Sequence, residues 1–211
     1  MTVPSSVQPQ SQQQDPDVLV RLGGRLFRQR TWLPLPIALA LVLWPSRPLA
    51  SPFLVWSGAV LVVSGELLRL WAVRHIGVVS RTRSDRLGPL VATGPFARLR
   101  NPLYLGNIAL WVGFSASAGL GWLISPIALL LALEYHAIVR WEERLLEGRL
   151  GDAYREYAAR VPRWIPLASP VSLNPRVSSP KFSWRQTLFS ERGTLLAIAA
   201  GYWLLWYKSR V

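Results

Sequence analysis

Five apolar runs divide this chain of 211 residues, and charged segments separate them. The runs lie at about residues 31–44, 52–73, 102–117, 121–139 and 193–207. A helix needs about 20 apolar residues to cross a bilayer, and the second run is long enough to do so. The first and last runs are short, but arginines that reach back to the interface let a short run span. The sequence therefore predicts an all-α membrane protein with about five transmembrane helices.

Basic residues are distributed unevenly between these runs. Four precede the first run, six lie between the second and third, and ten lie between the fourth and fifth. The opposite loops hold three, namely Arg47, Lys208 and Arg210. Cytoplasmic loops collect Lys and Arg, so the basic loops and the N-terminus are predicted to be cytoplasmic. The basic residues that give the chain its net charge of +13 flank the apolar runs and do not line one groove. This pattern indicates membrane lipids, and not nucleic acid, as partners.

Composition divides the chain into four parts. Residues 1–22 are polar and predict a disordered tail, and residues 23–166 hold the first four runs. A Pro- and Ser-rich linker is predicted over residues 167–190, before a last transmembrane helix over residues 191–211. Arginine outnumbers lysine 22 to 2, a bias typical of GC-rich bacterial genomes, so the bacterial plasma membrane is the predicted location. The chain has no cysteine, which excludes a disulfide framework and a Cys-ligated zinc site, and no metal site is predicted.

Polar residues gather where the third run begins. Asn101 followed by Pro102 is a common helix start, with Asn at the cap and Pro in the first turn. Arg100, Tyr104 and Asn107 remain unexplained by capping, although polar groups in an apolar helix are costly without a partner. Their spacing of four and seven residues places them on one helix face. Such a face indicates either a binding site or interhelical hydrogen bonds, and spacing alone does not choose between them.

Two further groups of charged residues adjoin apolar runs. Glu142 and Glu143 lie at the end of the fourth run. They belong either to a solvated charged turn or to a site in which their carboxylates bind a cationic ligand or orient an arginine. Glu66 and Arg69, three residues apart in the second run, predict an ion pair on one helix face.

A short amphipathic helix is predicted on the cytoplasmic side after the fourth run. Asp152 is a suitable cap for it, and Tyr154, Tyr157 and Val161 fall on one of its faces. Such a helix lies naturally at a membrane interface.

Together these segments resemble the isoprenylcysteine carboxyl methyltransferases and phospholipid methyltransferases. That family carries a Gly-Pro-Tyr…Arg-His-Pro-x-Tyr-x-Gly segment, a Glu-Glu-x-x-Leu segment, and a Gly-x-x-Tyr-x-x-Tyr…Val-Pro-x-x-x-Pro tail. The corresponding segments of this chain are Gly94-Pro95-Phe96, Arg100 to Gly106, Glu142 to Leu146, and Gly151 to Pro166. Two positions depart from the pattern: Asn101 stands where the family usually has His, and Phe96 stands where it has Tyr.

The resemblance implies a methyltransferase that binds S-adenosylmethionine at the cytoplasmic helix ends and methylates a lipophilic acceptor. Arg100, Asn101 and Tyr104 are the implied catalytic residues. The implied cofactor-binding residues are Gly94, Arg100, Asn101, Pro102, Tyr104, Gly106, Asn107, Glu142 and Glu143. Because an amide cannot act as a general base near neutral pH, Asn101 favours an acceptor that is already ionised. The presence of Asn101 in place of His also leaves an alternative open: a non-catalytic membrane protein of the same fold that binds lipid or serves as an accessory subunit.

Overall fold

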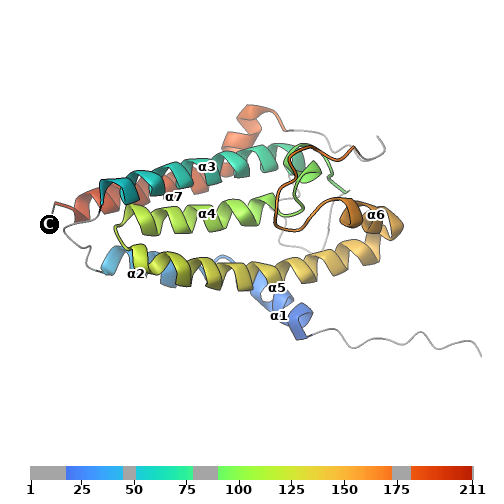
Figure 1. Cartoon of the computed structure of the whole chain (residues 1–211), viewed down its shortest axis with the longest axis horizontal. Helices are drawn as coiled ribbons and strands as arrows, with labels where there is room; N and C mark the ends of the chain where they lie inside the picture. Colours follow the sequence, from blue (N-terminus) through green and yellow to red (C-terminus); the bar gives the residue numbers. More distant parts are fainter. Residues whose placement is uncertain (1–17, 45–50, 78–89, 173–181, 211) are drawn as a thin grey trace, which may run out of the picture.

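The computed structural model describes residues 18–44, 51–77, 90–172 and 182–210, and within these ranges all of the regular secondary structure is helical. Long helices lie side by side along the long axis of the molecule, and a short helix lies at one end of them (Figure 1). The α-helices are α1 (Val18–Gln29), α2 (Leu35–Leu43), α3 (Pro52–Ile76), α4 (Pro102–Ser117), α5 (Ile124–Leu150), α6 (Asp152–Arg160) and α7 (Trp184–Lys208). Two 3-10 turns, η2 (Gly94–Ala97) and η3 (Gly121–Leu123), precede α4 and α5.

Two of the described helical segments are long and apolar enough to cross a membrane, Pro52–Ile76 and Gly121–Leu150. Large apolar side chains on them face outward, among them Phe53 at 81% exposure and Leu133 at 63%. An apolar surface of this kind suits a lipid environment. The first predicted span contains only the nine-residue α2, which reaches about 14 Å. The all-helical class is confirmed for the described residues, and five transmembrane helices remain a prediction.

Helices occupy parts of the segments that were predicted to be a tail and a linker. Helix α1 starts at Val18, so residues 18–22 are helical and do not belong to a disordered tail, while residues 1–17 lie outside the described residues. Helix α7 starts at Trp184, inside the predicted linker. The reason is a capping box: the Ser183 hydroxyl accepts a hydrogen bond from the Gln186 amide, and the Gln186 side chain accepts one from the Ser183 amide.

Glycines let α3 and α4 pack with their backbones in close contact. Gly58 faces Gly113, and Gly65 faces Gly106, so the two contacts are spaced seven positions apart on each of the antiparallel helices. A Cβ on Gly113 would lie 2.7 Å from the Gly58 carbonyl oxygen and 2.9 Å from the Val62 amide nitrogen. Small residues at helix contacts are the usual means of association in membranes, because lipid removes the hydrophobic drive between helices.

Helix α6 turns its apolar face onto the protein. Tyr154, Tyr157 and Val161 are buried together with Leu90 and Ala92, so the predicted shared face is confirmed. Asp152 is the first residue of the helix and makes no cap; the cap position belongs to Gly151, whose φ is 55°. This packing places α6 next to the segment that leads into α4, at the same end of the molecule (Figure 1).

Candidate functional site

Two segments far apart in the sequence run beside each other at this end. The Arg100 amide donates to the Pro162 carbonyl at 2.9 Å, the Leu167 amide to the Arg98 carbonyl at 3.0 Å, and the Val171 amide to the Ala97 carbonyl at 2.9 Å. Residues 97–101 and 161–171 are thereby joined by backbone hydrogen bonds. This pairing brings the segment before α4 to the segment after α6.

Asn101 occupies the cap position of α4, but its side chain does not cap the helix. Its Nδ2 donates instead to the Arg163 carbonyl oxygen at 3.1 Å. The capping role predicted for this side chain is therefore wrong, because the neighbouring segment offers a carbonyl acceptor that a single-helix argument does not include. Pro102 is the first helical residue of α4, as predicted, and it is buried.

Glu143 is held between two arginines. Arg100 Nη1 lies 3.2 Å from Glu143 Oε1, and Arg163 Nε lies 3.0 Å and 3.1 Å from the two carboxylate oxygens. Hydrogen bonding to this carboxylate raises the pKa of Arg163 above its ordinary value. Arg163 was not among the predicted site residues. Its only signal in the sequence was a basic side chain inside the Val-Pro-x-x-x-Pro tail.

A cavity of about 910 Å³ opens beside this ion pair. Its lining comes from the ends of α1, α5 and α6 and from both paired segments: Val20, Arg100, Arg140, Glu143, Arg144, Glu147, Gly148, Tyr154, Arg155, Ala158, Ala159 and Arg163. The volume is at the upper end of the usual range for small-molecule sites. Arg100 Nε is buried and has no hydrogen-bond partner within the described ranges, which is costly. A ligand atom that accepts a hydrogen bond from Nε would remove this cost. Burial raises the pKa of Tyr154, so its phenol stays neutral and can donate.

Glu142 and Tyr104 form a second pair on the inner side of α5. The Tyr104 hydroxyl donates to Glu142 Oε1 at 3.0 Å, and the Tyr104 ring packs on Tyr135 with centroids 4.8 Å apart. Neither residue of this pair lines the cavity. Consecutive helical residues point about 100° apart, so Glu143 faces the cavity while Glu142 faces the helix bundle.

The predicted shared face of Arg100, Tyr104 and Asn107 is not formed. Arg100 lies before the first turn of α4, where helical spacing does not apply. Asn107 Oδ1 accepts from Arg69 of α3, and Gly106 packs on the same arginine. The predicted site residues therefore lie in different places. Arg100 and Glu143 line the cavity, Tyr104 and Glu142 form a pair, and Gly106 and Asn107 contact Arg69.

Gly94 begins η2 with a φ of 62°, a conformation that favours glycine. A Cβ there would lie 2.4 Å from Nε2 of His75, whose Nδ1 is bonded to the Trp71 carbonyl. The turn is also held by the Tyr157 hydroxyl, which donates to the Phe96 carbonyl at 2.9 Å. Gly94 thus positions the segment that carries Arg100 and does not itself line the cavity.

We expect Gly94→Ala to lower the free energy of unfolding by about 2 kcal/mol, since it adds a strained φ and a collision with His75. Thermal unfolding in detergent should show a midpoint that falls by about 4–8 °C. In a His75→Ala background the collision is removed but the strain persists, so the same change should cost less. An equal loss in both backgrounds would contradict the steric part of this account.

Comparison with known proteins finds similarity over the middle of the chain. Residues 53–153, from α3 to the start of α6, match the profile of the phospholipid methyltransferase family. The chain is also 31% identical over 119 residues to the cobalt-zinc-cadmium resistance protein CzcN of Cupriavidus metallidurans, and 33% identical over 119 residues to the nickel-cobalt-cadmium resistance protein NccN of Alcaligenes xylosoxydans xylosoxydans. Each match covers 56% of this chain, and 52% and 53% of the two relatives, so the chain spans about half their length. Residues 53–153, just under half of the chain, therefore match the phospholipid methyltransferase family, as the resemblance in the sequence predicted.

Proposed function

We propose that this protein is an integral membrane methyltransferase that uses S-adenosylmethionine and acts on a lipophilic acceptor. The observation that carries the proposal is the cavity beside Arg100 and Glu143, which lies in and next to the part of the chain that matches the methyltransferase family. The match to the methyltransferase family supports the reaction type and the methyl donor. The cavity supplies a place for the donor.

The cavity lining fits the polar groups of S-adenosylmethionine, which carries a carboxylate, an amine and hydroxyls. Arg100 has a buried Nε without a partner among the described residues, and it would bind the carboxylate. Glu143 would accept from the amine or a hydroxyl, and the neutral Tyr154 phenol would donate. When bound, the cofactor supplies an activated methyl group. The residues of this chain orient the partners and exclude water around them.

The acceptor class follows from the groups around the site. Asn101 is bonded to the Arg163 carbonyl and cannot take a proton near neutral pH, and His75 is packed against Gly94. No imidazole appears among the side chains that line the cavity in the described part of the chain. An acceptor that is already ionised, such as an isoprenoid carboxylate, an acidic lipid or a thiolate, needs no general base. We propose that class for this protein.

The arrangement of charges supports a membrane orientation. Arginines of α5, α6 and the paired segments gather around the cavity at one end of the helices. Aromatic residues mark the opposite end, where Trp44 packs on Trp122 with centroids 5.2 Å apart and Trp203 stacks on Tyr207. Basic residues favour the cytoplasmic side and tryptophans favour an interface. We propose that the cavity end faces the cytoplasm of a bacterial plasma membrane.

The first experiment is equilibrium binding of labelled S-adenosylmethionine to the detergent-purified protein. We expect micromolar affinity for the unaltered protein and a loss of about tenfold or more in Arg100→Gln, because a charge-assisted hydrogen bond is lost. Arg185→Gln, at an exposed position of α7 outside the cavity, is the matched control and should bind normally.

Absence of binding by folded protein would favour the second candidate, a non-catalytic membrane protein of the same fold. The observation in its favour is Asn101, which stands where the family usually has His. Its side-chain amide donates a hydrogen bond to the Arg163 carbonyl oxygen. The two relatives are named for resistance to metals, so an accessory role in such resistance is the form this candidate takes. Methyl transfer to any acceptor in a lipid screen would exclude it.

A further inference from the structure

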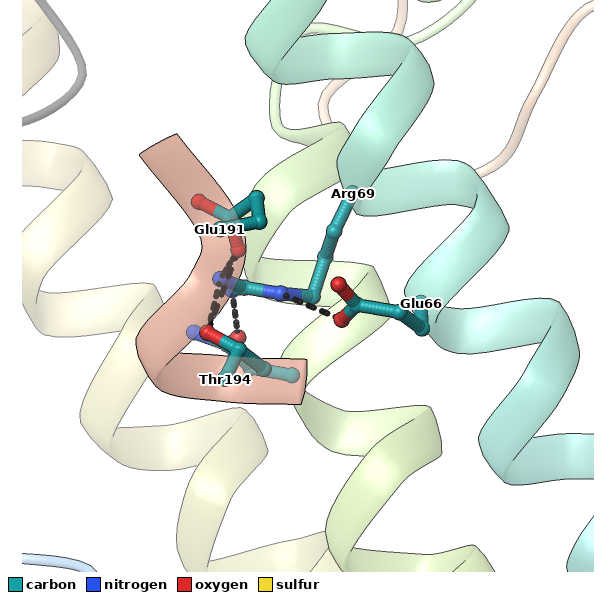
Figure 2. Close-up of polar contacts among 5 residues, drawn as sticks. Glu66, Arg69, Glu191 and Thr194 are labelled. Carbon is teal, nitrogen blue, oxygen red and sulfur yellow. Dashed lines mark hydrogen bonds and ion pairs between the residues drawn. The ribbon is translucent and has the colours of Figure 1, made fainter. Parts of the chain in front are cut away.

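A second polar cluster lies between α3, α4 and α7, away from the cavity. Arg69 of α3 lies at its centre, with Nε 3.3 Å from Glu66 and Nη2 bonded both to Glu191 and, at 3.2 Å, to Thr194 of α7 (Figure 2). The Thr194 hydroxyl also donates to Glu191 at 3.1 Å. Glu66 and Glu191 are only 5% and 4% exposed. Buried ionisable groups between membrane helices usually serve a function, because they are expensive to place there.

Arg69 can reach α7 because α4 leaves room for it. A Cβ on Gly106 would lie 2.6 Å from Arg69 Cγ, so any larger residue would displace the arginine. As the guanidinium passes α4, its Nη1 donates to Asn107 Oδ1. The match to the methyltransferase family ends at residue 153, whereas Glu191 and Thr194 lie on α7 beyond it. One arginine therefore joins the family region to a helix outside the match.

The contacts continue from Asn107 to the candidate site. The Asn107 side chain lies beside the Tyr135 hydroxyl of α5. The Tyr135 ring packs on Tyr104, and the Tyr104 hydroxyl donates to Glu142. Glu142 directly precedes Glu143, whose carboxylate lines the cavity. The steps as far as Glu142 are contacts between buried or half-buried side chains, and the last step, from Glu142 to Glu143, runs along the backbone of α5.

We propose that Glu191 and Arg69 are positioning residues through which helix α7 sets the affinity of the cavity for the cofactor. The ion pair fixes Asn107, which orients Tyr135 and Tyr104 and, through Glu142, the end of α5. The predicted effect on cofactor affinity rests on the proposed function. The coupling itself is a property of the protein alone and can be measured without any ligand.

The variant Glu191→Gln tests the proposal with little risk to folding, because Arg69 keeps its ion pair with Glu66. We expect it to weaken S-adenosylmethionine binding by about 2- to 30-fold, the usual range for coupling through packed networks. The same change in a Tyr104→Phe background should have an effect below about twofold, since the connection to Glu142 is already broken. Glu156→Gln, which removes an exposed ion pair with Arg160, is the matched control and should leave affinity unchanged.

A second measurement separates this inference from the proposed function. With 3-fluorotyrosine at position 104 in the ligand-free protein, Glu191→Gln should shift the fluorine resonance, and Glu156→Gln should not. If the unaltered protein binds no S-adenosylmethionine but the resonance shifts, the proposed function fails and the coupling stands. An unchanged resonance, or additive effects of Glu191→Gln and Tyr104→Phe on affinity, would show that the cluster only holds α7 in place and would overturn the proposal.

Discussion

Replacing Gly113 by valine should separate α3 from α4 and lower the free energy of unfolding by about 3 kcal/mol. The new Cβ would lie within 3 Å of the Gly58 oxygen and the Val62 amide nitrogen, which are backbone atoms that cannot rotate away. The two helices must therefore move apart along the contact that also holds Gly65 against Gly106. In detergent, the thermal unfolding midpoint followed by circular dichroism should fall by about 6–12 °C.

Gly193→Val is the matched control for this change. Gly193 lies on an exposed face of α7, and a Cβ there meets no atom within 4 Å. Valine is a better helix residue than glycine, so the midpoint should stay the same or rise slightly. Equal losses in the two variants would mean that the cost is intrinsic to valine in a helix and that the α3–α4 glycine contact has no special role.

Much of the helical framework could be predicted from the sequence, because apolar runs and helix-start residues act locally. Pro102 begins α4 as expected, and Glu66 pairs with Arg69 as helical spacing required. The start of α7 was missed, since Ser183 lies among Pro and Ser residues and its partner Gln186 carries no charge that marks a helix start. A search for capping pairs on either side of each apolar run would have found it.

The candidate site was harder to predict, because its contacts join segments far apart in the chain. Helical spacing relates residues within one helix, so it placed Arg100 and Asn107 on one face although they serve different clusters. It also gave Asn101 a capping role, whereas its amide bonds to Arg163, 62 positions away in the chain. Family resemblance supplied Arg100 and Glu143, since motif order carries information about tertiary contact that spacing does not.

Glu143 pairs with an arginine from each of the two paired segments, and its replacement should loosen the contact between them. In Glu143→Gln the guanidinium groups of Arg100 and Arg163 lose the charge that both of them share. Arg100 is only 14% exposed in its side chain, so water replaces the lost interaction poorly. We expect the pairing of residues 97–101 with 161–171 to weaken by about 2–3 kcal/mol.

Amide hydrogen exchange in detergent would measure this loss, because the Leu167 and Val171 amides are bonded across the pair. Their exchange should accelerate by about 30- to 150-fold in Glu143→Gln, while amides in the middle of α3 and α4 keep their protection. Glu147→Gln, one turn further along α5, is the matched control. Its ion pair with Arg155 is half exposed at 3.4 Å, so exchange should change by less than about threefold. Uniform acceleration across α3 and α4 would contradict a local role, because the carboxylate would then support the whole fold and not this pair of segments.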